Sequence, residues 1–246
     1  MVEDTPEIAA ELHSFGNVAD HTNQLLLPFP LRPSARFETF VAGENKILLD
    51  ILQTSNNGQD LTAPVWVWGE SGCGKTHLLQ AFCAATEKKA IYLPLNDLKK
   101  SPEILQGLSS LDIVALDDID IVVGDSDWDQ ALFSIFNGLW TEGGVLLCSA
   151  RHSPASLSFS LPDLGSRAAG SSIYQVKGLS DEDSILALRA RAQSRGIDLP
   201  ESSARFLITH VRRDMGTLCL FLESLNRASV LKQRKLTIPF IRDQLD

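Results

Sequence analysis

Short apolar runs alternate with helical patterns between residues 37 and 177. The helical patterns include Thr76–Thr86 and Trp128–Leu139, where leucine and phenylalanine recur at the spacing of one helix face. Strands that alternate with helices favour a parallel sheet covered on both faces. We therefore predict an α/β domain with a five-stranded parallel sheet between helices. Its strands are predicted at Val65–Trp68, Ile91–Leu93, Ile113–Leu116, Val145–Cys148 and Ile173–Val176.

The strand pattern stops after Gly178, and only helical patterns follow. Ser180 precedes three acidic residues, which is typical of a helix N-terminus. Pro200 and Glu201 open a second helix, and Asp214 precedes a longer one with apolar residues at helical spacing. Residues 178–246 are therefore predicted to form a small all-helical domain.

Residues 1–36 contain few periodic apolar positions and end in a stretch with Pro28, Pro30 and Pro33. This composition predicts a flexible N-terminal tail, so that the α/β domain spans residues 37–177.

The eight residues from Gly69 to Thr76 match the phosphate-binding P-loop spacing G-x-x-x-x-G-K-[ST] in full. Glycines let backbone N–H groups surround phosphate oxygens, Lys75 can reach the β- and γ-phosphates, and the Thr76 hydroxyl can bind Mg²⁺. A chance match in a glycine-rich turn is disfavoured, because an apolar strand leads in and a helix leads out. The predicted nucleotide-binding residues are Gly69, Glu70, Ser71, Gly72, Cys73, Gly74, Lys75, Thr76 and His77.

Two acidic residues, Asp117 and Asp118, end the apolar strand that begins at Ile113. Acids in this position are often solvated turn residues. Together with a P-loop, they predict that Asp117 holds Mg²⁺ through water and that Asp118 orients an attacking water.

Composition and charge limit the binding partners and the cellular compartment that we expect for the chain. The net charge of −9 argues against a large duplex-DNA footprint. Lys232, Arg234 and Lys235 form a small basic cluster that we interpret as a solvated face, so direct DNA binding is expected to be weak or absent. The four cysteines are scattered, and neither a secretory signal nor an apolar run of about 18 residues is present. These features predict a cytoplasmic protein without a membrane partner.

The P-loop, the strand ending in Asp-Asp and the C-terminal helices resemble the AAA+ ATPases, and more narrowly the DnaA branch. Within that branch the chain is similar to the Hda family of DnaA-related regulators. The similarity extends over residues 24–246 and includes three further segments: Leu161–Arg167, Leu179–Asp183 and Gln233–Phe240.

This resemblance implies a negative regulator of DNA replication initiation that binds ADP, or alternatively ATP, with Mg²⁺. Its partners would be the initiator DnaA and the sliding clamp, the polymerase beta subunit. Arg167 matches the position of an arginine finger, which would act in trans on ATP bound by DnaA. From the residues alone, a surface or structural ion pair is the favoured explanation of Arg167.

The resemblance also implies that the clamp is bound by the peptide from Gln24 to Phe29, through Gln24, Leu25, Leu27 and Phe29. An extended, proline-stiffened peptide can place Leu27 and Phe29 in an apolar groove while the Gln24 amide fixes the register. The other interpretation is an apolar tail that packs on its own domain.

The chain departs from the family pattern at two positions that normally sense the nucleotide. Ala150 replaces a polar residue after the fourth strand, with Ser149 as a substitute, and Gly216 stands where the lid arginine is expected. Arg212 and Arg213 lie one turn earlier. We therefore predict that the chain's own ATPase activity is weak or absent.

Two other functions stay open: an autonomous AAA+ ATPase or helicase loader acting on single-stranded DNA, and a P-loop kinase of a small metabolite. The oligomeric state is also open, a homodimer being one arrangement.

Overall fold

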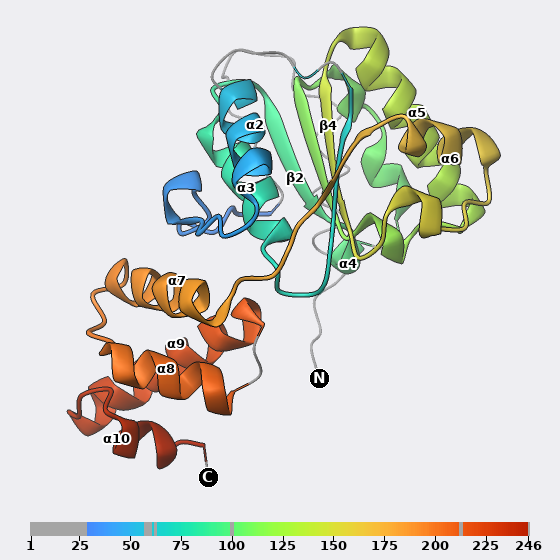
Figure 1. Ribbon diagram of the computed structural model, residues 1–246. Coiled ribbons are helices and arrows are strands. Elements are labelled where there is room, and N and C mark those ends of the chain that lie inside the picture. Colours follow the sequence, from blue (N-terminus) through green and yellow to red (C-terminus); the bar gives the residue numbers. More distant parts are fainter. Residues whose placement is uncertain (1–28, 57–60, 62, 99–100, 212–213, 246) are drawn as a thin grey trace.

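The computed structural model describes residues 29–56, 61, 63–98, 101–211 and 214–245 (Figure 1). Five parallel strands form one sheet in the order β2-β3-β4-β1-β5. The strands are β1 (Val65–Trp68), β2 (Ala90–Pro94), β3 (Ile113–Asp117), β4 (Val145–Ala150) and β5 (Ser172–Gln175). The predicted α/β class with a five-stranded parallel sheet is confirmed.

Helices cover both faces of the sheet (Figure 1). On one face α2 and α3 pack over side chains such as Val65 and Val67, and on the other α5 and α6 pack over Trp66 and Val114. Alternate strand residues therefore point into two separate cores, as the pleat of a strand requires. The helices of this region are α2 (Lys46–Asn56), α3 (Lys75–Ala85), α4 (Leu95–Leu98), α5 (Ser126–Glu142) and α6 (Pro162–Ala169). Short 3₁₀ turns complete it: η2 (Phe37–Thr39), η3 (Pro102–Leu105), η4 (Leu108–Ser110), η5 (Ile119–Ile121) and η6 (Pro154–Ser156).

Helices are the only regular secondary structure among the described residues after 178. We call this part the lid, and we call residues 29–177 the base. The Ser180 hydroxyl accepts a hydrogen bond from the Asp183 N–H at 3.1 Å, and the Asp214 carboxylate accepts one from the Thr217 N–H at 2.8 Å. Both residues thus cap helices as their sequence positions predict. The lid helices are α7 (Asp181–Gln193), α8 (Glu201–His210), α9 (Met215–Lys232) and α10 (Ile238–Arg242), around their own apolar core.

A pair of hydrogen bonds fixes the connection between base and lid. The Asn45 side chain donates to the Lys177 carbonyl at 2.9 Å and accepts from the Lys177 N–H at 2.8 Å. Asn45 is 4% exposed, and the two bonds are partly buried. The linker therefore leaves the base at a defined point, and the lid lies beyond the carboxyl ends of the strands (Figure 1).

The first described residues correct the prediction of a tail that extends to residue 36. Phe29 packs against both cores of the base, and Ala35 is buried. The Arg32 N–H donates to the Gln80 side chain of α3 at 3.1 Å. Residues 29–36 therefore belong to the base, because their apolar side chains find partners there that no local periodicity indicates.

Among the described helices, none has an apolar stretch of the kind that a bilayer span requires.

Candidate functional site

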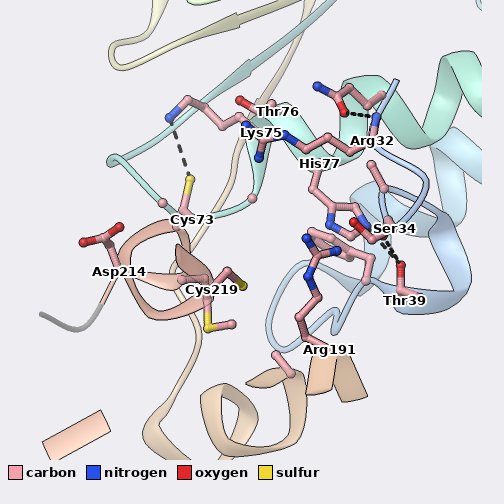
Figure 2. A pocket seen from close by; sticks show the side chains of 18 of the residues that line it. Arg32, Ser34, Thr39, Cys73, Lys75, Thr76, His77, Arg191, Asp214 and Cys219 are labelled. Atoms are coloured by element: carbon pink, nitrogen blue, oxygen red, sulfur yellow. Dashed lines mark hydrogen bonds between the residues drawn. The ribbon is translucent and has the colours of Figure 1, made fainter. Parts of the chain in front are cut away.

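A cavity of about 640 Å³ lies where the P-loop, the N-terminal segment of the base and the lid meet (Figure 2). This volume falls within the usual range of small-molecule sites. Of the predicted nucleotide-binding residues, those from Ser71 to His77 line it. Other lining residues come from segments far apart in the chain: Arg32, Thr39, Phe40, Gln80, Asp118, Arg151, Leu179, Arg191, Arg195, Asp214, Gly216, Cys219 and Glu223.

Two positions of the P-loop have a backbone conformation that favours glycine. Gly72 and Gly74 have φ values of +77° and +108°. A Cβ at Gly74 would lie 2.8 Å from the Phe40 ring, and one at Gly72 would lie 2.6 Å from the Asp214 Cβ. The loop is thus closely covered by the N-terminal segment and by the lid.

Lys75 is buried at the start of α3, with 6% of its surface exposed. Its ammonium group donates hydrogen bonds to the carbonyls of Gly69 at 2.8 Å and Glu70 at 2.9 Å. Gly69 and Glu70 therefore serve the site through these carbonyls and do not line the cavity. A phosphate is a stronger acceptor for an ammonium than a carbonyl, so the arrangement suits an anionic ligand.

Asp117 lies beneath the cavity at the end of β3, 3% exposed. One of its oxygens accepts a hydrogen bond from the Ser149 hydroxyl, and the other accepts one from the Tyr92 hydroxyl at 2.7 Å. Burial and the charge of Asp117 raise the pKa of Tyr92, so the phenol stays a donor. Asp117 is not among the residues that line the cavity, which is compatible with a contact to a ligand through water.

Asp118 does line the cavity, in a left-handed backbone conformation with φ of 57°. Its N–H donates to the Ser149 hydroxyl at 2.9 Å. Burial, followed by the nearby charge of Asp117, raises the pKa of the Asp118 carboxyl. Ser149 is fully buried and bridges the two acids, so its observed contacts are structural, and Ala150 is equally buried.

Positively charged side chains outnumber negatively charged ones in the lining of the cavity, whereas the chain as a whole has a net negative charge. The lining includes five Lys and Arg side chains and three Asp and Glu side chains, in a chain of net charge −9. The cations are Arg32, Lys75, Arg151, Arg191 and Arg195. This surplus favours a ligand with phosphate groups.

Arg191 reaches from α7 of the lid toward His77 on the base (Figure 2). Its side chain is 19% exposed, and its Nε is buried without a hydrogen-bond partner among the described residues. Glu223 is 3.8 Å from Arg191 and 2.5 Å from Arg195, so one carboxylate faces two guanidinium groups. Burial and then Arg195 lower the pKa of Arg191, and burial lowers the pKa of His77. A buried donor without a partner, on a residue that lines the cavity, is compatible with a ligand acceptor.

Arg167 lies elsewhere, in the last turn of α6. The side chain is exposed, does not line the cavity and forms no ion pair or hydrogen bond with any described residue. In Figure 1, α6 lies beside α5, on the face of the sheet opposite α2 and α3. The structural ion pair that the sequence left open is therefore absent within the described part of the chain.

Several predicted residues lie outside the described ones: Gln24, Leu25, Leu27, Arg212 and Arg213. Phe29, the last residue of the predicted clamp-binding peptide, is described and is half-buried against the base. Gly216 lines the cavity, so the position expected to hold a lid arginine faces the site without a side chain.

The sequence interpretation missed most of the cavity's cations. Arg151 could have been predicted from the sequence, because it directly follows an apolar strand. Ligands of parallel α/β sheets bind beyond the carboxyl ends of the strands. Arg32, Arg191 and Arg195 give no such signal. They reach the cavity because the N-terminal segment and the lid fold over it.

Comparisons with known proteins agree with this architecture. Residues 31–169 match the model of the bacterial DnaA ATPase domain, and residues 181–245 match the model described as "Hda, lid domain". A protein of Haemophilus influenzae, described only as uncharacterized, is 42% identical over 229 residues, which cover 91% of this chain and 98% of that one. Domain III of the Thermotoga maritima replication initiation protein DnaA superposes with a TM-score of 0.77 at 22% identity, over 87% of this chain and 96% of that one. AMPPCP-bound DnaA from Aquifex aeolicus gives a TM-score of 0.68 at 20% identity, over 80% and 65% of the two chains.

Proposed function

Because the chain belongs to the Hda-like, DnaA-related family of AAA+ proteins, we propose that it regulates replication initiation by stimulating ATP hydrolysis on DnaA. In this proposal the chain binds a nucleotide in its own cavity and offers Arg167 to ATP held by the partner. It acts as an activator of the partner's hydrolysis, and its own ATPase activity is weak or absent.

ADP, or alternatively ATP, is the proposed ligand of the cavity. The Ser71–Thr76 amides and Lys75 would hold the phosphates, and the surplus of arginines supports this assignment. Mg²⁺ would be held by the Thr76 hydroxyl and, through water, by Asp117; when bound, it neutralises phosphate charge. The shell of hydroxyls around Asp117 leaves each carboxylate oxygen a further lone pair, which is compatible with that role.

The nucleotide is proposed to order the interface between base and lid, not to be consumed. Gly216 provides no cation at the start of α9, and Arg191 of α7 takes that place across the cavity in our proposal. Its unmatched Nε would donate to the bound nucleotide and couple the lid to it.

One observation carries the proposed action in trans: Arg167 is an exposed arginine without a partner among the described residues, on a helix remote from the chain's own cavity. An arginine finger can raise phosphoryl transfer by about 10³–10⁵-fold, by stabilising charge on the transferring group. Such a finger has to stay free for the partner's site, and Arg167 meets that requirement.

Clamp binding by residues 24–29 is proposed as the means of localisation. Tethering to a clamp on DNA raises the local concentration of the regulator without adding catalysis. Phe29 packs on the base in this structure, so docking of Phe29 into a clamp groove requires it to leave those contacts.

The test is ATP turnover by DnaA with this protein and a DNA-loaded clamp, each omitted in turn. The proposal expects fast hydrolysis only when all three are present. Hydrolysis by this protein alone that single-stranded DNA stimulates would instead support an autonomous ATPase.

A further inference from the structure

A second buried acid lies outside the nucleotide cavity. Asp129, in the first turn of α5, is fully buried, and no described lysine, arginine or histidine pairs with it. Its charge is instead satisfied by hydrogen-bond donors from two loops. One oxygen accepts from the Gly124 N–H at 3.1 Å; the other accepts from the Ser160 N–H at 2.5 Å, the Ser160 hydroxyl at 2.8 Å and the Leu161 N–H at 3.4 Å.

A carboxylate is a costly residue to place in a core. Burial of a charge is strongly unfavourable unless hydrogen bonds satisfy it, and Asp129 meets this requirement through its four donors. Its distinctive property is that it fixes particular backbone groups in place, because hydrogen bonds are directional whereas apolar contacts are not.

The groups that Asp129 fixes lead directly into the helix of Arg167. Leu161 is the residue before α6, and no side chain of the helix's own N-terminal segment caps it. Asp129 supplies an acceptor at this point from the neighbouring helix, and its negative charge is favourable near a helix N-terminus. The buried side chains of Leu164 and Ala168 determine which face of α6 packs inward. Pro162 at the first position of α6 favours a helix start there, and the bonds to Asp129 tie the two residues before it, Ser160 and Leu161, to α5.

We propose that Asp129 is a positioning residue that sets the height and direction from which α6 presents Arg167 to the partner's ATP. This inference rests on the proposed function of Arg167. Asp129 does not touch the reacting atoms and acts only through the placement of the helix. A displacement of about 1 Å at a catalytic group can lower a rate by about a hundredfold.

The test compares Asp129→Asn with Asp125→Ala in stimulated ATP hydrolysis by DnaA on loaded clamps. Asn has the size of Asp, but an NH₂ group replaces one of the two carboxylate oxygens. That group is a donor, so it cannot accept the hydrogen bonds of Ser160 and Leu161 or, in the other orientation, that of Gly124. Asp125 is a matched control, because it caps the same helix α5 through the N–H groups of Asp127 and Trp128 and does not bond the segment before α6.

We expect Asp129→Asn to lower the maximal stimulation by about tenfold or more, since the displacement argument allows up to about a hundredfold per ångström. The concentration for half-maximal stimulation and the stabilisation by ADP should be unchanged. Asp125→Ala should lower the melting temperature by about 2–4 °C, as loss of a cap does, without lowering the maximal stimulation. If Asp129→Asn does not fold, Ser160→Ala replaces it: that variant removes one hydroxyl donor and should show a smaller loss of the same kind.

Arg167→Ala is measured in parallel, which separates this inference from the function on which it rests. If Arg167→Ala stimulates normally, the proposed function fails. If Arg167→Ala is defective while Asp129→Asn or Ser160→Ala stimulates as well as Asp125→Ala, the positioning role is refuted. An effect on half-maximal concentration alone would also refute it, because that result indicates a binding surface.

Discussion

Two cationic side chains of the molecule, those of Lys75 and Arg167, differ in burial and in hydrogen bonding. Lys75 is 6% exposed, is bonded to two carbonyls of its own loop and is one of the residues that line the cavity. The Arg167 side chain is exposed at the end of a short helix and forms no ion pair or hydrogen bond with any described residue. A buried cation needs partners within the fold or a bound ligand, whereas an exposed one remains available to another molecule. The contrast is the basis on which we propose Lys75 for the chain's own nucleotide and Arg167 for a partner.

The largest effect is expected where the buried cation is removed. Lys75→Ala should abolish thermal stabilisation by ADP, which for the intact site amounts to about 2.7 kcal/mol at 100 times Kd. Lys177→Ala is the matched control, because that lysine is exposed and, among the described residues, its side chain pairs with Glu44 at the surface. Melting curves with and without ADP make the comparison. Equal stabilisation of Lys75→Ala and the control would show that the cavity does not bind phosphate through Lys75.

A smaller effect is expected at the lid. Arg191→Ala should weaken ADP binding by about tenfold, the loss expected for one hydrogen bond from a charged donor. Arg189→Ala serves as the control, because Arg189 lies on the same helix, is 45% exposed and faces Glu201 at 3.6 Å. Calorimetric titration with ADP measures both variants. If they bind ADP equally well, the unmatched Nε of Arg191 has no part in nucleotide binding.

An effect of similar size is expected in the N-terminal segment. Phe29→Ala should lower the melting temperature by a few degrees, because loss of a half-buried phenyl ring costs about 1–2 kcal/mol. Replacement of Gln24 and Leu27 by alanine should weaken clamp capture with little change in melting temperature. Clamp pull-down and thermal melting on both variants distinguish packing on the base from docking to the clamp. Full clamp capture by both variants would contradict the predicted peptide.

The sequence predicted the base well because its signals are local. Each predicted strand lies within two residues of an observed one, since the five apolar runs are short and bounded by turns or helices. The P-loop carries its own geometry in its glycines, and the caps at Ser180 and Asp214 are encoded by single side chains. In each case the residues that determine the structure are neighbours in the chain.

The parts that were missed depend on contacts between distant segments. The arginines of the lid line the cavity only because α7 folds against η2, and residues 29–36 pack on the base through single apolar side chains. Ser149, interpreted as a sensor, is committed to Asp117 and Asp118 by the register of β4 beside β3. Asp129 was not noticed, because nothing in the first turn of an amphipathic helix indicates that an acid will be buried.

The most direct test of the account is single-turnover hydrolysis of ATP bound to DnaA, with a loaded clamp and equal amounts of ADP-bound wild type or Arg167→Ala. We predict that Arg167→Ala lowers the stimulated rate by at least about tenfold. A full arginine-finger contribution would correspond to a loss of about 10³–10⁵-fold. Arg167→Lys should fail nearly as badly, because an ammonium lacks the planar fork that spans two phosphate oxygens. Melting temperature and ADP binding should be unchanged in both variants. Undiminished stimulation by a stably folded Arg167→Ala would contradict the account and would leave the chain as a nucleotide-gated clamp adaptor.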